Sequence, residues 1–82
     1  MSTVTVLYFA AVGEFLGKKE ETMPLPPTGT VRALLEALAA RHPGLGARLP
    51  HLRVARNEEF TSLDAELAPG DVIALIPPVA GG

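Results

Sequence analysis

One segment of this 82-residue sequence has a long helical pattern, and the other patterned segments have the pattern of strands. Apolar side chains recur there at helical spacing and form a single stripe, at Val31, Leu34, Leu35, Leu38 and Ala39. Thr30 is a suitable N-cap, and Pro43-Gly44 ends the helix. Because one helix covers only one face of a sheet, the sequence predicts an α+β fold.

Four segments have the composition of β-strands: 3–10, 19–25, 52–56 and 72–76. In the first of them, side-chain alternation separates two faces, one with Val4, Val6 and Tyr8 and the other with Thr5, Leu7 and Phe9. Residues 11–18 contain two glycines and are expected to form a connection, and residues 45–50 a short turn of helix. The run Ala68-Pro69-Gly70-Asp71 predicts a turn before the last strand.

The last predicted strand, residues 72–76, is apolar on both faces. In a sheet with one covering helix, its uncovered side would hold Val72, Ala74 and Ile76 near Phe9. An exposed apolar patch of this kind indicates a protein partner. A central strand shielded by loops is the alternative, and the sequence does not separate the two.

Length and composition exclude several classes of protein. The chain is one domain's length, and at 48% hydrophobic residues it is too apolar for intrinsic disorder. It has no cysteine, so neither disulfides nor a thiolate metal site is expected. A net charge of −2 gives no footprint for nucleic acid. Neither a secretory signal nor a membrane span is recognisable, so we expect a soluble, cytoplasmic protein with no membrane association.

Few of the remaining polar residues suggest a site of their own. The two histidines, His42 and His51, lack further ligands, so no metal site is predicted. Residues 57–71 carry five acidic side chains and no basic one, which fits either a basic partner or a solvated acidic loop. No catalytic constellation is recognisable, and the absence of a glycine-rich phosphate loop means that no cofactor is expected to bind directly.

The end of the sequence carries the clearest functional signal. Residues 1–76 form the predicted domain, and residues 77–82, Pro77-Pro78-Val79-Ala80-Gly81-Gly82, are expected to form an extended, flexible tail. The two prolines remove backbone donors and stop the sheet, while six extended residues reach roughly 20 Å. Such a tail suits insertion of a carboxylate into another protein's active site. A frayed, inert end is the alternative interpretation.

Several motifs give the chain a resemblance to a known family. They are Val6-Leu7-Tyr8-Phe9-Ala10, Val31-Arg32-Ala33-Leu34-Leu35, Val54-Ala55-Arg56-Asn57, Pro69-Gly70-Asp71-Val72 and the ending Ile76-Pro77-Pro78-Val79-Ala80-Gly81-Gly82. In these residues the whole chain resembles MoaD, the small subunit of molybdopterin synthase, in the MoaD/ThiS ubiquitin-like family. Gly13 departs from the family pattern, in which many members carry an arginine after the first strand.

The resemblance implies a β-grasp fold, with a mixed sheet of four to five strands and one main helix on one face. It also implies a sulfur carrier that is not catalytic alone. An activating enzyme would use ATP to adenylate the Gly82 carboxylate, and a sulfur donor such as a cysteine desulfurase would convert it to a thiocarboxylate. The tail (Pro77, Pro78, Val79, Ala80 and Gly81) would then enter the large catalytic subunit, where the sulfur passes to a pterin precursor.

Phe9, Phe60 and Ile76 are candidate partner contacts, by their places on the strands and by family likeness. For Phe60, simple core packing is an equal alternative. Other functions also stay open: a related carrier for thiazole synthesis or tRNA thiolation, a ubiquitin-like modifier that forms isopeptide bonds through Gly82, or a plain binding module with an inert tail.

Overall fold

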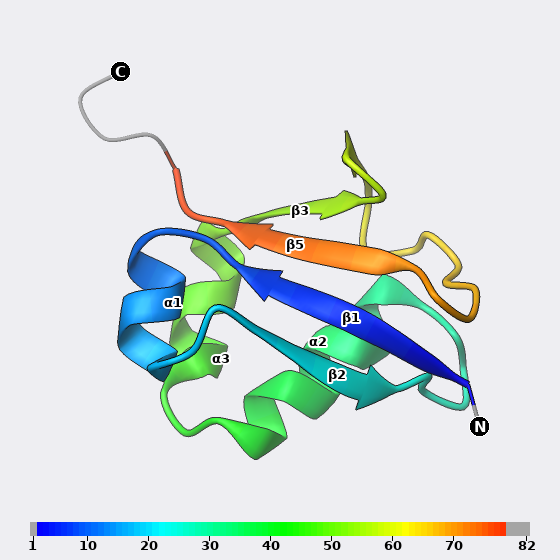
Figure 1. The fold of residues 1–82 in the computed structure, drawn as a ribbon, viewed down its shortest axis with the longest axis horizontal. Helices are drawn as coiled ribbons and strands as arrows, with labels where there is room; N and C mark the ends of the chain where they lie inside the picture. Colours follow the sequence, from blue (N-terminus) through cyan, green and yellow to red (C-terminus); the bar gives the residue numbers. More distant parts are fainter. Residues whose placement is uncertain (1, 79–82) are drawn as a thin grey trace.

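A five-stranded mixed sheet is the frame of the protein in the computed structural model, which describes residues 2–78 (Figure 1). In chain order the elements are β1 (Thr3–Tyr8), α1 (Ala11–Leu16), β2 (Glu20–Pro24), α2 (Val31–Arg41), α3 (Leu45–Arg48), the 3₁₀ helix η1 (Leu49–His51), β3 (Arg53–Arg56), β4 (Glu59–Phe60) and β5 (Val72–Ile76). The four strands predicted at residues 3–10, 19–25, 52–56 and 72–76 are therefore confirmed as β1, β2, β3 and β5. Their observed limits differ from the predicted ones by two residues at most.

The strand order across the sheet is β2-β1-β5-β3-β4. β1 and β5 are parallel neighbours, with Val6 opposite Ile73, whereas every other pair is antiparallel. β5, the last strand in sequence, thus lies in the middle of the sheet. A mixed sheet with its main helix on one face confirms the predicted α+β fold of the β-grasp type.

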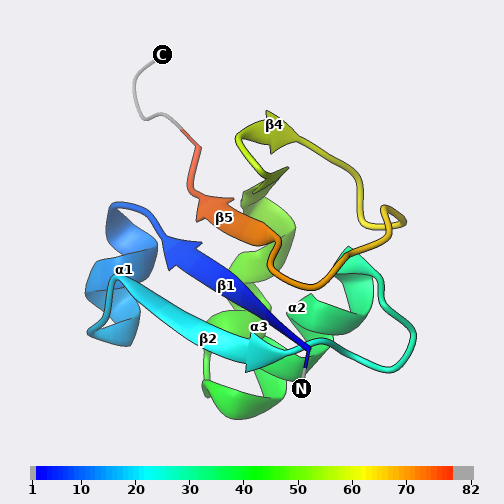
Figure 2. The same cartoon turned by 45° about the vertical axis from the view of Figure 1, so that its right-hand side comes forward.

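The main helix, α2, forms where the apolar stripe predicted it. The Thr30 hydroxyl accepts a hydrogen bond from the Ala33 backbone N–H at 3.2 Å and caps its first turn. In the two views of Figures 1 and 2, α2 lies behind the sheet and covers one face. Its buried side chains meet those of the sheet in one core, with Val31, Leu34, Leu35 and Leu38 from α2, Val4, Val6 and Tyr8 from β1, Val54 from β3, and Ile73 and Leu75 from β5.

The expected connection at residues 11–18 is instead a helix, α1, so that part of the prediction was wrong. The fold favours a helix here because Val12 becomes fully buried at the end of the sheet. Gly17 takes the left-handed C-cap position, with φ 74°, and its N–H donates to the Gly13 carbonyl at 2.8 Å. None of the helices within residues 2–78 is long and apolar enough to span a membrane.

Asp71 carries a buried carboxylate that ties the turn before β5 to the end of β3. Its Oδ2 accepts hydrogen bonds from the Arg56 Nε and the Ala68 backbone N–H, both at 2.8 Å, and its Oδ1 accepts one from the Asn57 Nδ2 at 3.0 Å. These donors favour the ionised carboxylate, first the Ala68 N–H and then Arg56 and Asn57, and together they lower the pKa of Asp71 to about 2.

Replacing Asp71 by asparagine is expected to lower the free energy of unfolding at pH 7 by about 2 kcal/mol, the order of magnitude that the shift in pKa implies. Because the folded-state pKa is depressed, this stabilisation is complete above the unfolded-state pKa and is lost as the pH falls toward about 2. Urea titrations followed by circular dichroism between pH 7 and pH 2 measure both effects. An Asp71→Asn variant as stable as the unaltered chain at pH 7 would contradict the assignment.

Ala10, which precedes α1, has φ 49° and ψ −124°, a strained conformation for a residue with a Cβ. We expect Ala10→Gly to raise the free energy of unfolding by about 1 kcal/mol, because relief of the strain outweighs the added entropy of glycine in the unfolded chain. Ala40→Gly, at an exposed position of α2, serves as the control and should lower it by about 1 kcal/mol. Equal losses for both variants in a urea titration would show that Ala10 is not strained.

Candidate functional site: an apolar groove beside the C-terminal segment

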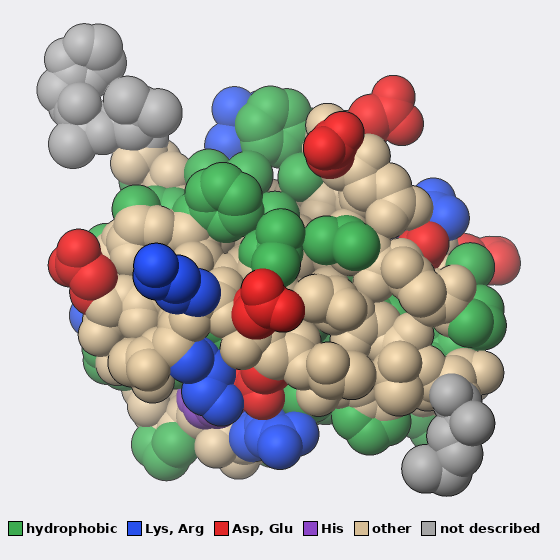
Figure 3. All heavy atoms as spheres, viewed as in Figure 1, with side chains coloured by type: hydrophobic (Ala, Val, Ile, Leu, Met, Phe, Trp, Pro, Cys, Tyr) green, Lys and Arg blue, Asp and Glu red, His purple; other side chains and the backbone are tan. Residues whose placement is uncertain are grey.

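The face of the sheet not covered by α2 carries a groove of about 240 Å³. Seven apolar residues and one carboxylate line it: Leu7, Phe9, Ala55, Phe60, Val72, Ala74, Ile76 and Glu58. They come from β1, β3, β4, β5 and the segments that follow β1 and β3. In Figure 3, hydrophobic side chains gather on this face over β5.

The groove exists because both faces of β5 are apolar. Ile73 and Leu75 point into the core and are fully buried, so alternation turns Val72, Ala74 and Ile76 to the opposite side. Val72 is 36% exposed, which shows that loops do not shield this side of the central strand. Of the two alternatives that the sequence left open, the structure therefore shows the exposed apolar patch near Phe9.

All three candidate partner contacts line this one groove. Phe9 is 46% exposed and Phe60 is 61% exposed, so the core-packing alternative for Phe60 was wrong. The Arg53 guanidinium lies over the Phe60 ring at 4.0 Å from its centroid, which steadies a large apolar side chain at the surface. That the three residues contact a partner stays a prediction. Phe9 and Phe60 are exposed on this surface, and Ile76 is half-buried beside them.

The C-terminal segment leaves the sheet at the edge of this groove. The Phe9 backbone N–H donates to the Leu75 carbonyl at 3.2 Å, so the ends of β1 and β5 are held together. Ile76 is both the last residue of β5 and part of the groove lining. Pro77 is half-buried, and Pro78 is exposed. The other tail residues predicted as functional, Val79, Ala80, Gly81 and Gly82, lie outside the described residues.

The structure gives a reason for the glycine at position 13. A Cβ at this position would lie 2.9 Å from the Tyr8 carbonyl oxygen and 3.1 Å from that of Lys18. Both neighbours are backbone atoms and cannot rotate away, so a side chain here requires the segment after β1 to move. The chain therefore approaches its own backbone closely at Gly13.

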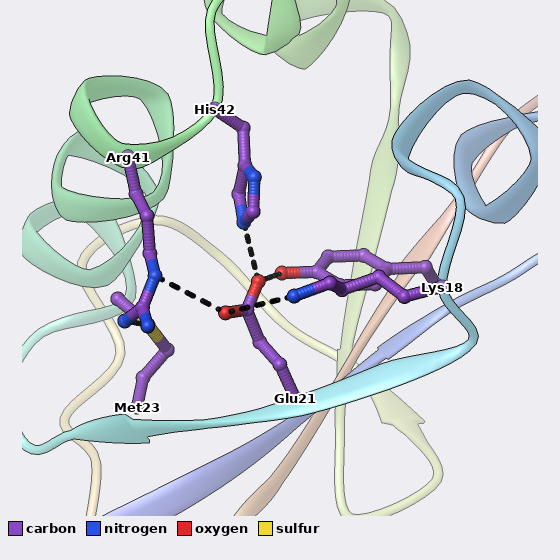
Figure 4. Close-up of polar contacts among 6 residues, drawn as sticks. Lys18, Glu21, Met23, Arg41 and His42 are labelled. Carbon is purple, nitrogen blue, oxygen red and sulfur yellow. Dashed lines mark hydrogen bonds and ion pairs between the residues drawn. The ribbon is translucent and has the colours of Figure 1, made fainter.

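A second polar cluster lies around Glu21, between β1, β2 and the end of α2 (Figure 4). Its carboxylate, only 7% exposed, accepts hydrogen bonds from the Tyr8 hydroxyl and His42 Nε2 and pairs with Arg41 at 3.4 Å and Lys18 at 3.8 Å. Burial alone would raise the pKa of Glu21, but the hydrogen bonds from Tyr8 and His42, with the charges of His42 and Lys18, lower it. Burial and the same hydrogen bond raise the pKa of Tyr8.

The Glu21 cluster is a structural clamp. It joins two strands to the C-terminal end of the main helix, and among the described residues no buried side-chain nitrogen or oxygen lacks a hydrogen-bond partner. His42 therefore does more than the helix-end role that the sequence indicated, because its ring links α2 to β2. His51, predicted in a loop, ends the 3₁₀ helix η1.

The acidic stretch at residues 57–71 is divided by the fold. Asp71 is buried in its network, and Asp64 pairs with Arg32 at 2.9 Å on the surface. Glu58 alone of these side chains lines the groove. No group of three or more histidine, cysteine or acidic side chains in residues 2–78 is arranged to hold a metal ion.

The sequence indicated part of the groove and missed part of it. Alternation along 3–10 had already placed Leu7 on the same side as Phe9, so this residue was recoverable. Ala55 and Glu58 were not, because their positions depend on β3 pairing with β5 and on the turn that follows β3.

Known proteins are similar to this chain in sequence and in fold. The ThiS family model matches residues 6–82. The molybdopterin synthase sulfur carrier subunit of Homo sapiens is 38% identical, over 96% of this chain and 93% of that protein. Small archaeal modifier protein 1 of Haloferax volcanii is 35% identical, over 90% of this chain and 94% of that protein.

Solved structures give the same picture. The crystal structure of SAMP1 from Haloferax volcanii superposes with a TM-score of 0.87 at 33% identity, covering 98% of this chain and 99% of that one. A chain from the complex of subunits 1 and 2 of the molybdopterin-converting factor from Helicobacter pylori gives 0.72 at 27% identity, covering 98% and 99%. By sequence and by fold, the chain described here belongs to the ThiS family.

Proposed function

We propose that this chain is a sulfur carrier for molybdenum cofactor synthesis, and that it acts as the small subunit of molybdopterin synthase. The observation that carries the proposal is the apolar groove beside the origin of the C-terminal segment, on a chain 38% identical to a sulfur carrier subunit. The groove would dock on a partner while the residues after Ile76 extend into the partner's active site. The chain itself would supply a carboxylate, and the catalytic groups would belong to its partners.

The chemistry at Gly82 would have three steps. An activating enzyme joins the Gly82 carboxylate to the α-phosphate of ATP and releases pyrophosphate, which turns a poor leaving oxygen into a good one. The terminal sulfur of a persulfide on a donor such as a cysteine desulfurase then attacks the acyl carbon, displaces AMP and forms an acyl disulfide. A second thiol of the donor system cleaves that S–S bond, becomes oxidised to a disulfide, and leaves the thiocarboxylate on Gly82. Because the chain has no cysteine, no side-chain thiol competes for the sulfur. The large subunit would then transfer the sulfur to the pterin precursor.

The groove suits the role of a docking surface. Its centre is apolar, and two exposed phenylalanines stand in it, Phe9 and Phe60. Aromatic side chains of this kind dominate the energy of many protein interfaces. The Helicobacter pylori relative comes from a complex of the two subunits of its molybdopterin-converting factor, which supports a large-subunit partner for this chain.

Incubation with ATP, the activating enzyme of the same organism and a sulfur source should raise the intact mass of the chain by the replacement of one oxygen by sulfur. Mass spectrometry of the whole protein detects the change directly. Deletion of Gly81-Gly82 should abolish the gain and leave the circular dichroism spectrum unchanged. The proposal would be overturned if the mass of this chain did not increase while the same activating enzyme was shown to be active on another carrier protein.

Phe60→Ala should weaken binding to the large synthase subunit by roughly tenfold or more, because it removes the most exposed aromatic side chain of the groove lining. Phe15→Ala is a matched control. Phe15 is also exposed, also lies 4.0 Å from an arginine (Arg48), and stands outside the groove. Isothermal titration calorimetry measures both variants, and equal losses would show that the groove is not the interface.

A role as a protein modifier is the second candidate, favoured by the likeness in sequence and in structure to small archaeal modifier protein 1 (SAMP1) of Haloferax volcanii. In that case the activated Gly82 would form an isopeptide bond with a lysine of another protein. Proteolysis of cell extracts followed by mass spectrometry would then find lysines that carry C-terminal peptides of this chain. If no such lysines are found and the chain does form a thiocarboxylate, sulfur transfer is the function that remains.

A further inference from the structure

Glu58 is the one ionisable residue among the described residues that line the groove. The other seven are apolar, so a partner that covers this surface removes one carboxylate from water along with them. Burying a charge without a counter-charge is strongly unfavourable, because the charge loses its hydration and gains no partner. Among the described residues, the groove lining is thus apolar except for one charged side chain, Glu58.

The backbone at Glu58 makes the presence of a glutamate there notable. Asn57 and Glu58 have φ values of 51° and 74°, and they are the central pair of the two-residue turn between the facing residues Arg56 and Glu59. Such a turn favours asparagine followed by glycine. Asn57 fits, because its side chain bonds to Asp71 and accepts from the Val72 backbone N–H at 2.9 Å. Glutamate at the second position is strained.

Among residues 2–78, no hydrogen bond or ion pair accounts for that strain. The Glu58 side chain has no hydrogen bond or ion pair with any described residue. The two arginines of the adjacent strand are otherwise engaged, since Arg53 lies over Phe60 and Arg56 binds Asp71. The carboxylate is therefore free of a described counter-charge at the edge of the apolar surface.

We infer that Glu58 is a specificity residue, and that it pairs with an arginine or lysine of the protein that docks on the groove. This inference rests on the proposed function, because it takes the groove as the docking surface. A cation beside an apolar patch would bind here, whereas a partner with an acidic or purely apolar surface would leave the carboxylate desolvated and unpaired. One residue would thus both attract the correct partner and reject others.

Binding to the large synthase subunit of the same organism tests the pairing. Glu58→Gln should weaken binding by roughly tenfold and Glu58→Lys by roughly a hundredfold. At high salt the affinities of the unaltered chain and of Glu58→Gln should become similar, because screening weakens the ion pair that only the unaltered chain makes. Glu59→Gln is the matched control, because it makes the same change of charge one residue away and outside the groove lining. Its effect should stay below about threefold.

Two further variants separate the backbone from the charge. Glu58→Gly relieves the left-handed strain and should raise the melting temperature by roughly 5 °C, while it weakens binding as much as Glu58→Gln. Glu58→Asn, which tolerates the left-handed conformation and has no charge, should also bind like Glu58→Gln. A purely structural role would not give higher stability together with lower affinity.

The outcomes distinguish this inference from the proposal beneath it. If the unaltered chain binds the large subunit and Glu58→Gln binds it equally well, the pairing is overturned and the sulfur-carrier proposal stands. Equal losses for Glu58→Gln and Glu59→Gln would also overturn it, because the effect would then be one of net charge. A failure of the unaltered chain to bind the large subunit would overturn the proposed docking and this inference together.

Discussion

The parallel pairing of β1 with β5 is the contact on which the rest of the structure depends. It joins Thr5–Tyr8 to Val72–Leu75, segments from opposite ends of the chain, and makes the last strand the centre of the sheet. A parallel pair needs a crossover, and the chain between the two strands supplies α2, which covers one face. The same pairing sets where the C-terminal segment leaves the sheet, beside Phe9 and the groove.

This arrangement gives β5 two different tasks. Ile73 and Leu75 belong to the core, whereas Val72, Ala74 and Ile76 stay partly open on the other face. Stability alone would be served by polar residues on the open side, because exposed apolar side chains favour association. Apolar side chains on the open side are favourable if a partner covers this surface during function. The groove is therefore the part of the structure that supports a docking function.

Two carboxylates hold the frame on which this surface is built. Glu21 links the edge strand and β1 to the end of α2, and Asp71 links the turn before β5 to β3. Both are buried and bound by several donors, so each restrains elements that are distant in sequence. Glu58 differs from both, since it is exposed and strained and has no described partner. The contrast separates carboxylates used for folding from one available for recognition.

The sequence by itself determined the local elements and the chemistry of the groove's central strand. The apolar stripe from Val31 to Leu38, the turn at Pro69-Gly70 and the two-sided apolar run at residues 72–76 predicted α2, the turn and β5, because periodicity and turn propensity are local properties. Only the tertiary structure decided the rest. The helix α1, the Glu21 clamp and the meeting of Phe9, Phe60 and Glu58 depend on contacts between segments far apart in the chain, which no local pattern encodes.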